Sequence, residues 1–308
     1  MADPALNELQ EEMILALLEQ VAPGSSLLNV NLLPGSFSNH THLIEARLPN
    51  GKPYKIVVRR YKVFGDYDRG EKARREFKTF ELLNQHQVPA PQALLLDETG
   101  ELLGVPGIVT RFVEGSLILE APSDAMDWAR KLARMLAKIH SIPCGKNEQS
   151  FLLKGNAEAT WFLKYERAPN YMQDYLHGAN LWQTLRELYP NIQEVYPSLL
   201  HIDYWSGNIL WHKNEISAVL DWEEAAYGDP AIDVAYARMN MFLMNLPDAA
   251  DEFLGVYESD MGCKIDNLGF WELAASVRPM TDPIDWKVTD TTGLNILLQF
   301  IEAAKKRV

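Results

Sequence analysis

Cysteine is scarce in this sequence: Cys144 and Cys263 are the only two among 308 residues. They lie far apart in the chain, so they form neither a disulfide framework nor the paired spacing of a metal-binding knuckle. Free thiols are the rule in a reducing cytosol. We therefore expect two unpaired thiols and a cytoplasmic protein.

Long apolar runs are also missing. No stretch approaches the ~20 apolar residues that a membrane-spanning helix needs. Residues 1–20 are acidic with a helical pattern, and they lack the basic start and the cleavage site of a signal peptide. We expect no membrane partner.

Basic residues are outnumbered, with 29 Lys and Arg against 42 Asp and Glu, for a net charge of −13. Proteins that bind nucleic acid need a basic face, so we expect no nucleic-acid partner. The acidic excess is compatible with a cationic small substrate, although an acidic surface more often serves solubility. Apolar residues make up 47% of the chain, enough for a full core.

The first third of the chain alternates in the manner of β-strands, with turn residues in the gaps. We expect a helix over residues 69–85, on which Glu76 is a charge on an otherwise apolar face, and an earlier helix over 6–21. The expected strands are residues 28–33, 42–48, 54–61, 94–97 and 108–113.

After Gly115 the pattern turns helical. Ser123 is the expected N-cap of a helix with an apolar face from Trp128 to Ile139. Further helices are expected over residues 231–243, 247–261, 267–278 and 289–306.

A short hairpin interrupts this helical region. Residues 209–211 and 216–220 are two apolar strands joined by a polar turn. A hairpin brings its ends together, so Asn208 and Asp221 should lie side by side, with Asp203 a few residues before them. Two carboxylates and an amide form a hard-oxygen site suited to Mg²⁺, with one acid left as a proton acceptor. Protein kinases arrange phosphoryl transfer in this way.

The run from His201 to Asp233 carries a specific resemblance. It matches nearly all of the pattern His-Gly-Asp, Gly-Asn-Ile/Val-Leu, Ile-Asp-Trp-Glu and Gly-Asp-Pro, in order and spacing. This pattern is typical of the aminoglycoside phosphotransferase family, part of a wider group with choline, homoserine and methylthioribose kinases. The resemblance implies an α+β, two-lobed, protein-kinase-like fold. It implies a β-rich nucleotide-binding lobe over residues 1–114 and a mostly helical catalytic and substrate-binding lobe over 115–308.

The resemblance also implies roles for three side chains. Asp203 would be the catalytic carboxylate that orients the acceptor hydroxyl and accepts its proton. Asn208 and Asp221 would hold Mg²⁺ on the nucleotide phosphates. Taken singly, each is an ordinary loop, turn or strand-end residue, and the joint pattern favours catalysis.

For the nucleotide, the resemblance points to the loop between the first two strands and to the third strand. Arg59 stands where most kinases carry Lys and would pair with Glu76; either Arg59 or Lys55 would contact the phosphates. The base would lie against the segment of Thr110 and Phe112. The loop residues whose backbone would cradle the phosphates are Ser36, Phe37, Ser38 and Asn39.

The acceptor side departs from the family pattern. Ile202 stands where the family usually has Gly, and Tyr204 and Trp205 stand where many members have Leu-His. These residues either shape the substrate site or merely pack. Glu223 is a candidate ligand for a substrate amine or a second metal.

Four polar residues are expected to be structural. His201 and His140 would pack in the core, and Asp233 would hold the backbone amides of the Asp203 loop. Asp229 is expected to start the turn before Pro230.

The predicted function is transfer of the γ-phosphoryl group of ATP, or GTP, with Mg²⁺, to a hydroxyl of a small molecule, either aminoglycoside-like or another cationic compound. The alternatives are a metabolic kinase of choline, sugar or amino-acid type, and a nucleotide-binding module without catalysis. A protein kinase is disfavoured because the sequence lacks an Ala-Pro-Glu segment and a long activation loop. The oligomeric state is not predicted.

Overall fold

The structure is a computed structural model that describes residues 9–33, 39–63, 68–175 and 177–308. The chain divides into two compact units. The first contains Met1–Ser116 and Leu210–Glu224, and the second contains Leu117–Ile209 and Ala225–Val308. The chain therefore passes from the second unit to the first and back again around the predicted hairpin.

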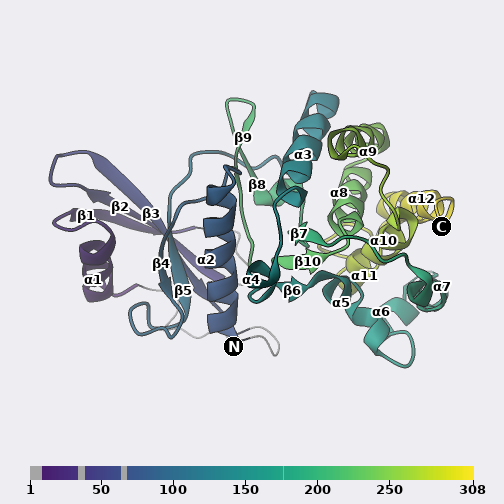
Figure 1. Cartoon of the computed structure of the whole chain (residues 1–308), viewed down its shortest axis with the longest axis horizontal. Coiled ribbons are helices and arrows are strands. Elements are labelled where there is room, and N and C mark those ends of the chain that lie inside the picture. The colour runs from purple at the N-terminus through teal and green to yellow at the C-terminus, as the bar shows by residue number, and fades with distance from the viewer. Residues whose placement is uncertain (1–8, 34–38, 64–67, 176) are drawn as a thin grey trace. The chain divides into compact units, whose positions relative to one another are not determined.

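The first unit is built on a five-stranded antiparallel sheet with the strand order β1-β2-β3-β5-β4. Two helices accompany it, α1 (Glu11–Val21) and α2 (Arg69–Gln85), and α2 contacts β3, β4 and β5 (Figure 1). The strands are β1 (Ser26–Leu32), β2 (Asn39–Arg47), β3 (Pro53–Tyr61), β4 (Ala93–Asp97) and β5 (Gly107–Arg111).

One apolar core joins α1 to this sheet. It includes Leu17 and Leu18 from α1 with Ile44, Ile56 and Val109 from the strands, all buried. Alternate residues of β3 are buried, as the period of a strand with one covered face requires. The hairpin of β8 (Ile209–His212) and β9 (Glu215–Val219) forms a separate two-stranded sheet.

The second unit is mostly helical. Helix α8 contacts α9, α10 and α12, and α3 packs on α9. A small sheet with the order β6-β10-β7 supports the chain just before His201. The helices are α3 (Ala125–His140), α4 (Lys146–Gln149), α5 (Gly155–Ala159), α6 (Asn170–Gln173), α7 (Gly178–Leu188), α8 (Ala231–Leu243), α9 (Pro247–Met261), α10 (Leu268–Ala275), α11 (Arg278–Thr281) and α12 (Thr291–Lys305). The short strands are β6 (Leu153–Lys154), β7 (Ser198–Leu200) and β10 (Ala226–Gly228), and the 3-10 turns are η2 (Trp161–Lys164), η3 (Tyr189–Asn191) and η4 (Ser206–Asn208).

Most of the expected elements are confirmed, with differences in some bounds and in one cap. Helix α1 begins at Glu11, later than expected, and β5 ends at Arg111, two residues earlier than expected. The N-cap of α3 is Asp124, whose carboxylate accepts the amide proton of Asp127 at 2.9 Å, so the cap is not Ser123. The helix expected over residues 267–278 stops at Ala275, and α11 begins at Arg278. Pro279 explains the break, because proline lacks an amide proton and is tolerated only in the first turn of a helix.

Among the described residues, no helix combines the length and the apolar character needed to cross a membrane. Cys144 is buried and Cys263 is exposed, and both are free thiols as expected.

Candidate active site

Asp233 holds the loop that carries Asp203 through hydrogen bonds to the loop backbone. The two carboxylate oxygens of Asp233 accept the amide protons of His201 and Ile202, each at 2.7 Å. Asp233 and His201 are both fully buried. The structural roles expected for these two residues are thereby confirmed.

His140 completes this buried support. Its Nε2 atom lies 3.2 Å from Asp233, and its Nδ1 atom lies 2.7 Å from the Tyr257 hydroxyl. Asp233 thus has a direct partner, His140, on α3. Through His140 it is linked to Tyr257 on α9. A buried carboxylate with this many partners makes the loop expensive to rearrange.

Ile202 has a left-handed backbone, with φ = +72°. This conformation costs a β-branched residue about 1–2 kcal/mol, whereas Gly adopts it without that cost. The side chain is only 2% exposed, and burying an Ile side chain contributes about 1.5–3 kcal/mol. Burial therefore offsets the backbone cost, and Ile202 becomes part of an apolar wall.

Within the second unit, the carboxylate of Asp203 has a partner on each oxygen. Asn208 donates from Nδ2 to Oδ2 at 2.8 Å and also to the backbone carbonyl of Asp203 at 2.9 Å. Arg278 contacts Oδ1 through Nη1 at 3.2 Å. Because Asn208 donates both bonds through its nitrogen, its amide oxygen is the atom that would face a cation.

Arg278 is a residue that the sequence patterns do not reveal. It lies 75 residues beyond Asp203 and belongs to no motif. Its guanidinium lies over the ring of Tyr236, 4.5 Å from the centroid. Burial raises the pKa of Tyr236 well above its ordinary value, and the charge of Asp203 acts in the same direction, so the hydroxyl stays protonated.

The polar residues predicted to bind the nucleotide, together with Asp221 and Glu223, belong to the first unit. Arg59 on β3 pairs with Glu76 at 3.0 Å, as expected, and also contacts Asp221 and Glu223. Lys55 instead pairs with Glu45 at 2.8 Å and is 42% exposed. Of the two basic side chains, Arg59 is therefore the one that lies beside Asp221. Its contact with the nucleotide phosphates stays a prediction.

Two side chains of helix α2 hold the backbone of the segment from Asp221 to Glu223. Glu76 accepts the amide proton of Trp222 at 3.1 Å, and Arg75 donates to the carbonyl of Glu223 at 2.6 Å. These bonds fix a turn in which Asp221 itself is left-handed, with φ = +64°.

Glu223 is turned into this network. Its carboxylate accepts from Asn39 at 2.8 Å and lies 3.5 Å from Lys72, in addition to its contact with Arg59. A substrate amine would have to replace these partners, so the surroundings of Glu223 favour a structural role. Asn39, predicted to approach the phosphates, is buried against this carboxylate. Ser36, Phe37 and Ser38, also predicted there, lie outside the described residues.

Cations and carboxylates alternate in this network. Arg59 contacts the carboxylates of Glu76, Asp221 and Glu223, and Lys72 contacts that of Glu223, whereas Arg75 donates to a backbone carbonyl. Burial raises the pKa of Glu76 to about 7, and Asp221 and Glu223 add to this shift, whereas Arg59 and the Tyr61 hydroxyl oppose it. Asp221 is the most accessible of the three acids, with a side chain 35% exposed.

The donors present suit a magnesium ion. Asn208 and Asp221 each offer a hard side-chain oxygen, and Mg²⁺ is usually bound by one or two carboxylates together with water and substrate phosphates. Among the described residues, no group of three or more His, Cys, Asp or Glu side chains forms a metal cage. Asn208 belongs to the second unit and Asp221 to the first, and each by itself is a suitable ligand for an ion carried in by a nucleotide.

The segment predicted to face the base lies on β5 and just beyond it. Thr110 is buried in the sheet, opposite Val57 of β3. The strand ends at Arg111, and Phe112 follows it. The amide of Phe112 donates to the carbonyl of Lys55 at 3.2 Å, so this amide belongs to the sheet. The role of both residues in binding a base stays a prediction.

Tyr204 and Trp205 differ in their surroundings. Tyr204 is fully buried, and its hydroxyl donates to the carbonyl of Leu132 at 2.9 Å. These surroundings favour packing in the core, the alternative that the sequence left open, and contact of Tyr204 with the acceptor stays a prediction. Trp205 is partly buried against a cluster that includes Tyr236, Met239 and Phe300.

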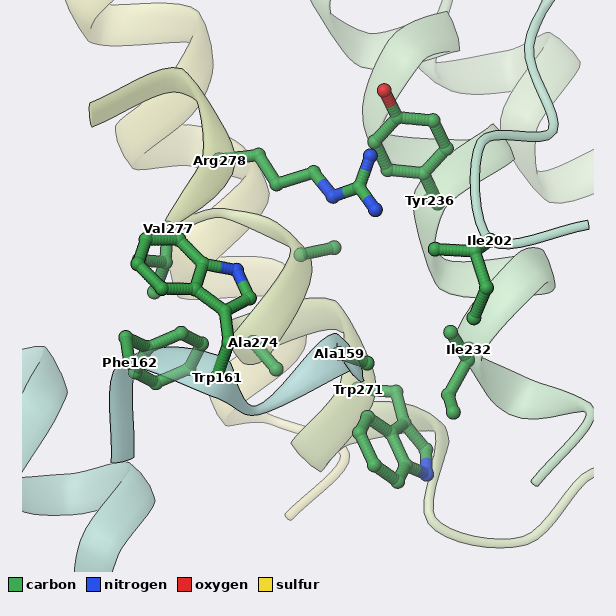
Figure 2. A pocket seen from close by; sticks show the side chains of 11 residues that line it. Ala159, Trp161, Phe162, Ile202, Ile232, Tyr236, Trp271, Ala274, Val277 and Arg278 are labelled. Carbon is green, nitrogen blue, oxygen red and sulfur yellow. The ribbon is translucent and has the colours of Figure 1, made fainter. Parts of the chain in front are cut away.

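An apolar pocket lies beside Asp203 in the second unit. It has about 350 Å³ of empty space, including the part open to solvent. Figure 2 shows Arg278 beside the ring of Tyr236, the two isoleucines facing them, and the tryptophans on the remaining sides. Its main lining residues are Trp161, Ile202, Ile232, Tyr236, Trp271 and Arg278.

Comparison with known proteins places this geometry in a family. The sequence model of the phosphotransferase enzyme family (APH) matches residues 31–263. A protein from Ralstonia eutropha JMP134 assigned to the aminoglycoside phosphotransferases has a similar structure, with a TM-score of 0.68, 19% identity, and coverage of 98% of this chain and 100% of that one. The GDP complex of aminoglycoside 2'-phosphotransferase-IIIa gives a TM-score of 0.62 with 18% identity, and covers 96% of this chain and 99% of that one. At these identities the likeness shows the kinase-like α+β fold, which confirms the predicted fold class.

A mouse protein, acyl-CoA dehydrogenase family member 10 (Mus musculus), is 26% identical over 228 residues. The match covers 64% of this chain but 21% of the mouse protein. The chain thus spans about a fifth of the length of the curated relatives that it matches.

Proposed function

Since this chain belongs to the phosphotransferase enzyme family, we propose that it transfers the γ-phosphoryl group of a nucleoside triphosphate, ATP or GTP, to a hydroxyl group of a small molecule. The observation that carries the proposal is the Asp203 carboxylate, which Asn208 and Arg278 hold on a loop that Asp233 supports. The GDP complex of a protein with the same fold supports nucleotide binding.

Asp203 is the proposed catalytic residue. In the reaction the acceptor oxygen bonds to the γ-phosphorus, the bond from that phosphorus to the β,γ-bridging oxygen breaks, the nucleoside diphosphate leaves, and the hydroxyl proton passes to Asp203. Two partners already fix the Asp203 carboxylate before the acceptor binds. Orienting the acceptor hydroxyl therefore costs little conformational entropy of this side chain.

Magnesium and the nucleotide are assigned to the remaining polar groups. Asn208 and Asp221 would hold Mg²⁺, which neutralises phosphate charge when bound. Arg59 would contact a phosphate bidentately, and its ion pair with Glu76 at 3.0 Å would orient it. Since Arg59 also contacts Asp221, metal binding at Asp221 would release a guanidinium donor toward the nucleotide.

The test is Asp203→Asn, which keeps the size of the side chain and removes its basicity. We expect acceptor-dependent turnover to fall by roughly 10²–10⁴, the range for loss of a general base. The affinity for Mg·ATP should change little, because Asp203 is not assigned to the nucleotide. Turnover is measured by release of nucleoside diphosphate, and affinity by calorimetric titration.

The matched control is Asp260→Asn, the same change on an exposed residue of α9, which should leave both quantities as in the parent protein. Full turnover in Asp203→Asn would remove the catalytic assignment. Mg·ATP binding without turnover in the parent protein, for every acceptor tried, would favour a nucleotide-binding module instead.

A further inference from the structure

The pocket beside Asp203 has an unusual lining for a site that receives a hydroxyl compound. Of the 11 residues that line it in the described chain, Arg278 alone carries a charge, and none is acidic. The walls are formed by indole, phenyl and aliphatic groups, which Figure 2 shows facing a common centre. The lining side chains favour apolar ligand groups, and their one charge is the guanidinium of Arg278, which pairs with Asp203 at 3.2 Å.

Two contacts tie this pocket to Asp203. Ile202, which forms one wall, is the preceding residue in the chain, and Arg278 contacts Asp203 Oδ1 at 3.2 Å. Both contacts lie within the second unit, so they do not depend on the arrangement of the two units. An acceptor whose hydroxyl meets Asp203 therefore has its body beside Ile202 and Arg278.

We propose that the acceptor is a small hydroxyl compound with an apolar body and a neutral or negative charge, which this pocket selects. The inference rests on the proposed phosphotransfer and specifies its substrate class. It differs from a cationic, aminoglycoside-like acceptor, because polyamines need acidic partners and the lining provides a guanidinium instead.

An aromatic cage for a quaternary ammonium is the competing interpretation. The occupied rings argue against it. The face of Tyr236 already carries the guanidinium of Arg278 at 4.5 Å. Trp161 packs in a tilted arrangement on Tyr171, with ring centroids 5.6 Å apart. A cation entering the pocket would also meet Arg278.

Three probes that share a benzyl alcohol test the preferred charge of the ligand. They are 4-methylbenzyl alcohol, 4-(hydroxymethyl)benzoate and 4-(aminomethyl)benzyl alcohol. Each carries the same aromatic body and primary hydroxyl, and the para group is neutral, negative or positive. Binding to the full chain with Mg²⁺ and a non-hydrolysable ATP analogue is followed by ligand-observed NMR up to about 10 mM, a range suited to fragments of this size. Phosphorylation with ATP is followed in parallel.

We expect the neutral and negative probes to bind at least about tenfold more tightly than the positive one. Ala159→Leu, which adds bulk inside the pocket, should weaken the two favoured probes by about tenfold, since it removes space for the body. Ala157→Leu is the matched control: it makes the same change on the same short helix, at an exposed position, and should have no effect.

Preference for the positive probe would overturn the inference and support the cage. Equal binding of favoured probes to Ala159→Leu and Ala157→Leu would also overturn it, as would no saturable binding of the neutral and negative probes. None of these results touches the proposed phosphotransfer, which fails separately if the parent protein does not bind Mg·ATP. Circular dichroism of Ala159→Leu checks its folding, and Ile232→Phe provides a second pocket-filling variant on α8.

Discussion

At the residue scale, two left-handed residues mark the predicted carboxylates: φ is +72° at Ile202 and +64° at Asp221. Strained backbone persists only where surrounding contacts over-determine it. Both segments have such contacts, because Asp233 holds the Ile202 amide at 2.7 Å and Glu76 holds the Trp222 amide at 3.1 Å. Each predicted acid therefore sits on a segment anchored by a second, buried acid.

Gly207 offers a test of the loop between Asp203 and Asn208. A Cβ atom added to Gly207 would overlap the indole of Trp205. We expect Gly207→Ala to displace this ring and the neighbouring Asn208, and to lower turnover by about tenfold or more while the global fold survives. Diphosphate release and near-ultraviolet circular dichroism measure the two effects. Gly255→Ala, on α9 with open space around its Cβ position, is the control; equal turnover in both variants would contradict the prediction.

The two thiols should differ in reactivity. Burial raises the pKa of Cys144 to about 11, whereas Cys263 is exposed. Since the thiolate is the reactive form, a pKa above the working pH keeps Cys144 protonated and inert at pH 8. A disulfide reagent at that pH should therefore modify one thiol per native chain and two after denaturation. Rapid modification of both thiols in the native protein would show that Cys144 is accessible.

At the level of elements, helix α8 provides three residues that contact other parts of the second unit. Asp233 on its first turn holds the loop of Asp203, and the ring of Tyr236 on the next turn lies against Arg278. Arg238 lies deeper, fully buried, with Nε 2.6 Å from Glu272 of α10. Arg307 contacts the other oxygen of Glu272 at 3.1 Å. One helix thus positions the loop and also anchors the helical core around it.

Breaking the buried pair should weaken that core. Glu272→Gln leaves the Arg238 guanidinium without its full counter-charge, and breaking a buried pair on one side costs about 3–5 kcal/mol. Denaturant unfolding measures the loss. Glu302→Gln is the matched control, since Glu302 pairs with Lys305 on the surface and its side chain is 65% exposed; it should change stability little. Similar losses in the two variants would show that the Arg238 pair has no special weight.

At the scale of the whole molecule, the predicted residues are shared between two units. Arg59, Glu76 and Asp221 belong to the first unit, and Asp203 and Asn208 to the second. The chain crosses between the units after Ile209 and again after Glu224. The hairpin strands therefore carry the covalent connection between Asn208 and Asp221, as the sequence pattern indicates.

Metal and nucleotide should stabilise the whole chain together. A ligand at 100 times its Kd stabilises the folded protein by about 2.7 kcal/mol, so Mg·ATP should raise the melting temperature. Removal of Mg²⁺ with EDTA should abolish most of this shift. Asp221→Asn should lose the magnesium-dependent part, because it removes the one carboxylate assigned to the ion, whereas Asp260→Asn should keep it. A magnesium-independent shift in the parent protein would contradict the assignment of Asp221.

The sequence by itself determined the elements with a strong local period. Helices α2, α8 and α9 have the predicted bounds, and the hairpin after Asn208 is confirmed. These predictions succeed because helix and strand periods, caps and turns depend on residues only a few positions apart. The run of polar residues in a fixed frame likewise identified the family.

The distant side chains around Asp203 and Glu223 come together only through tertiary packing. Arg278 reaches Asp203 across 75 residues, and Lys72 and Arg75 reach Glu223 from α2. The packing of Tyr204 and the apolar pocket beside Asp203 are likewise products of folding. Contacts of this kind leave no periodic trace in a single sequence, because they depend on how helices far apart in the chain pack around one loop.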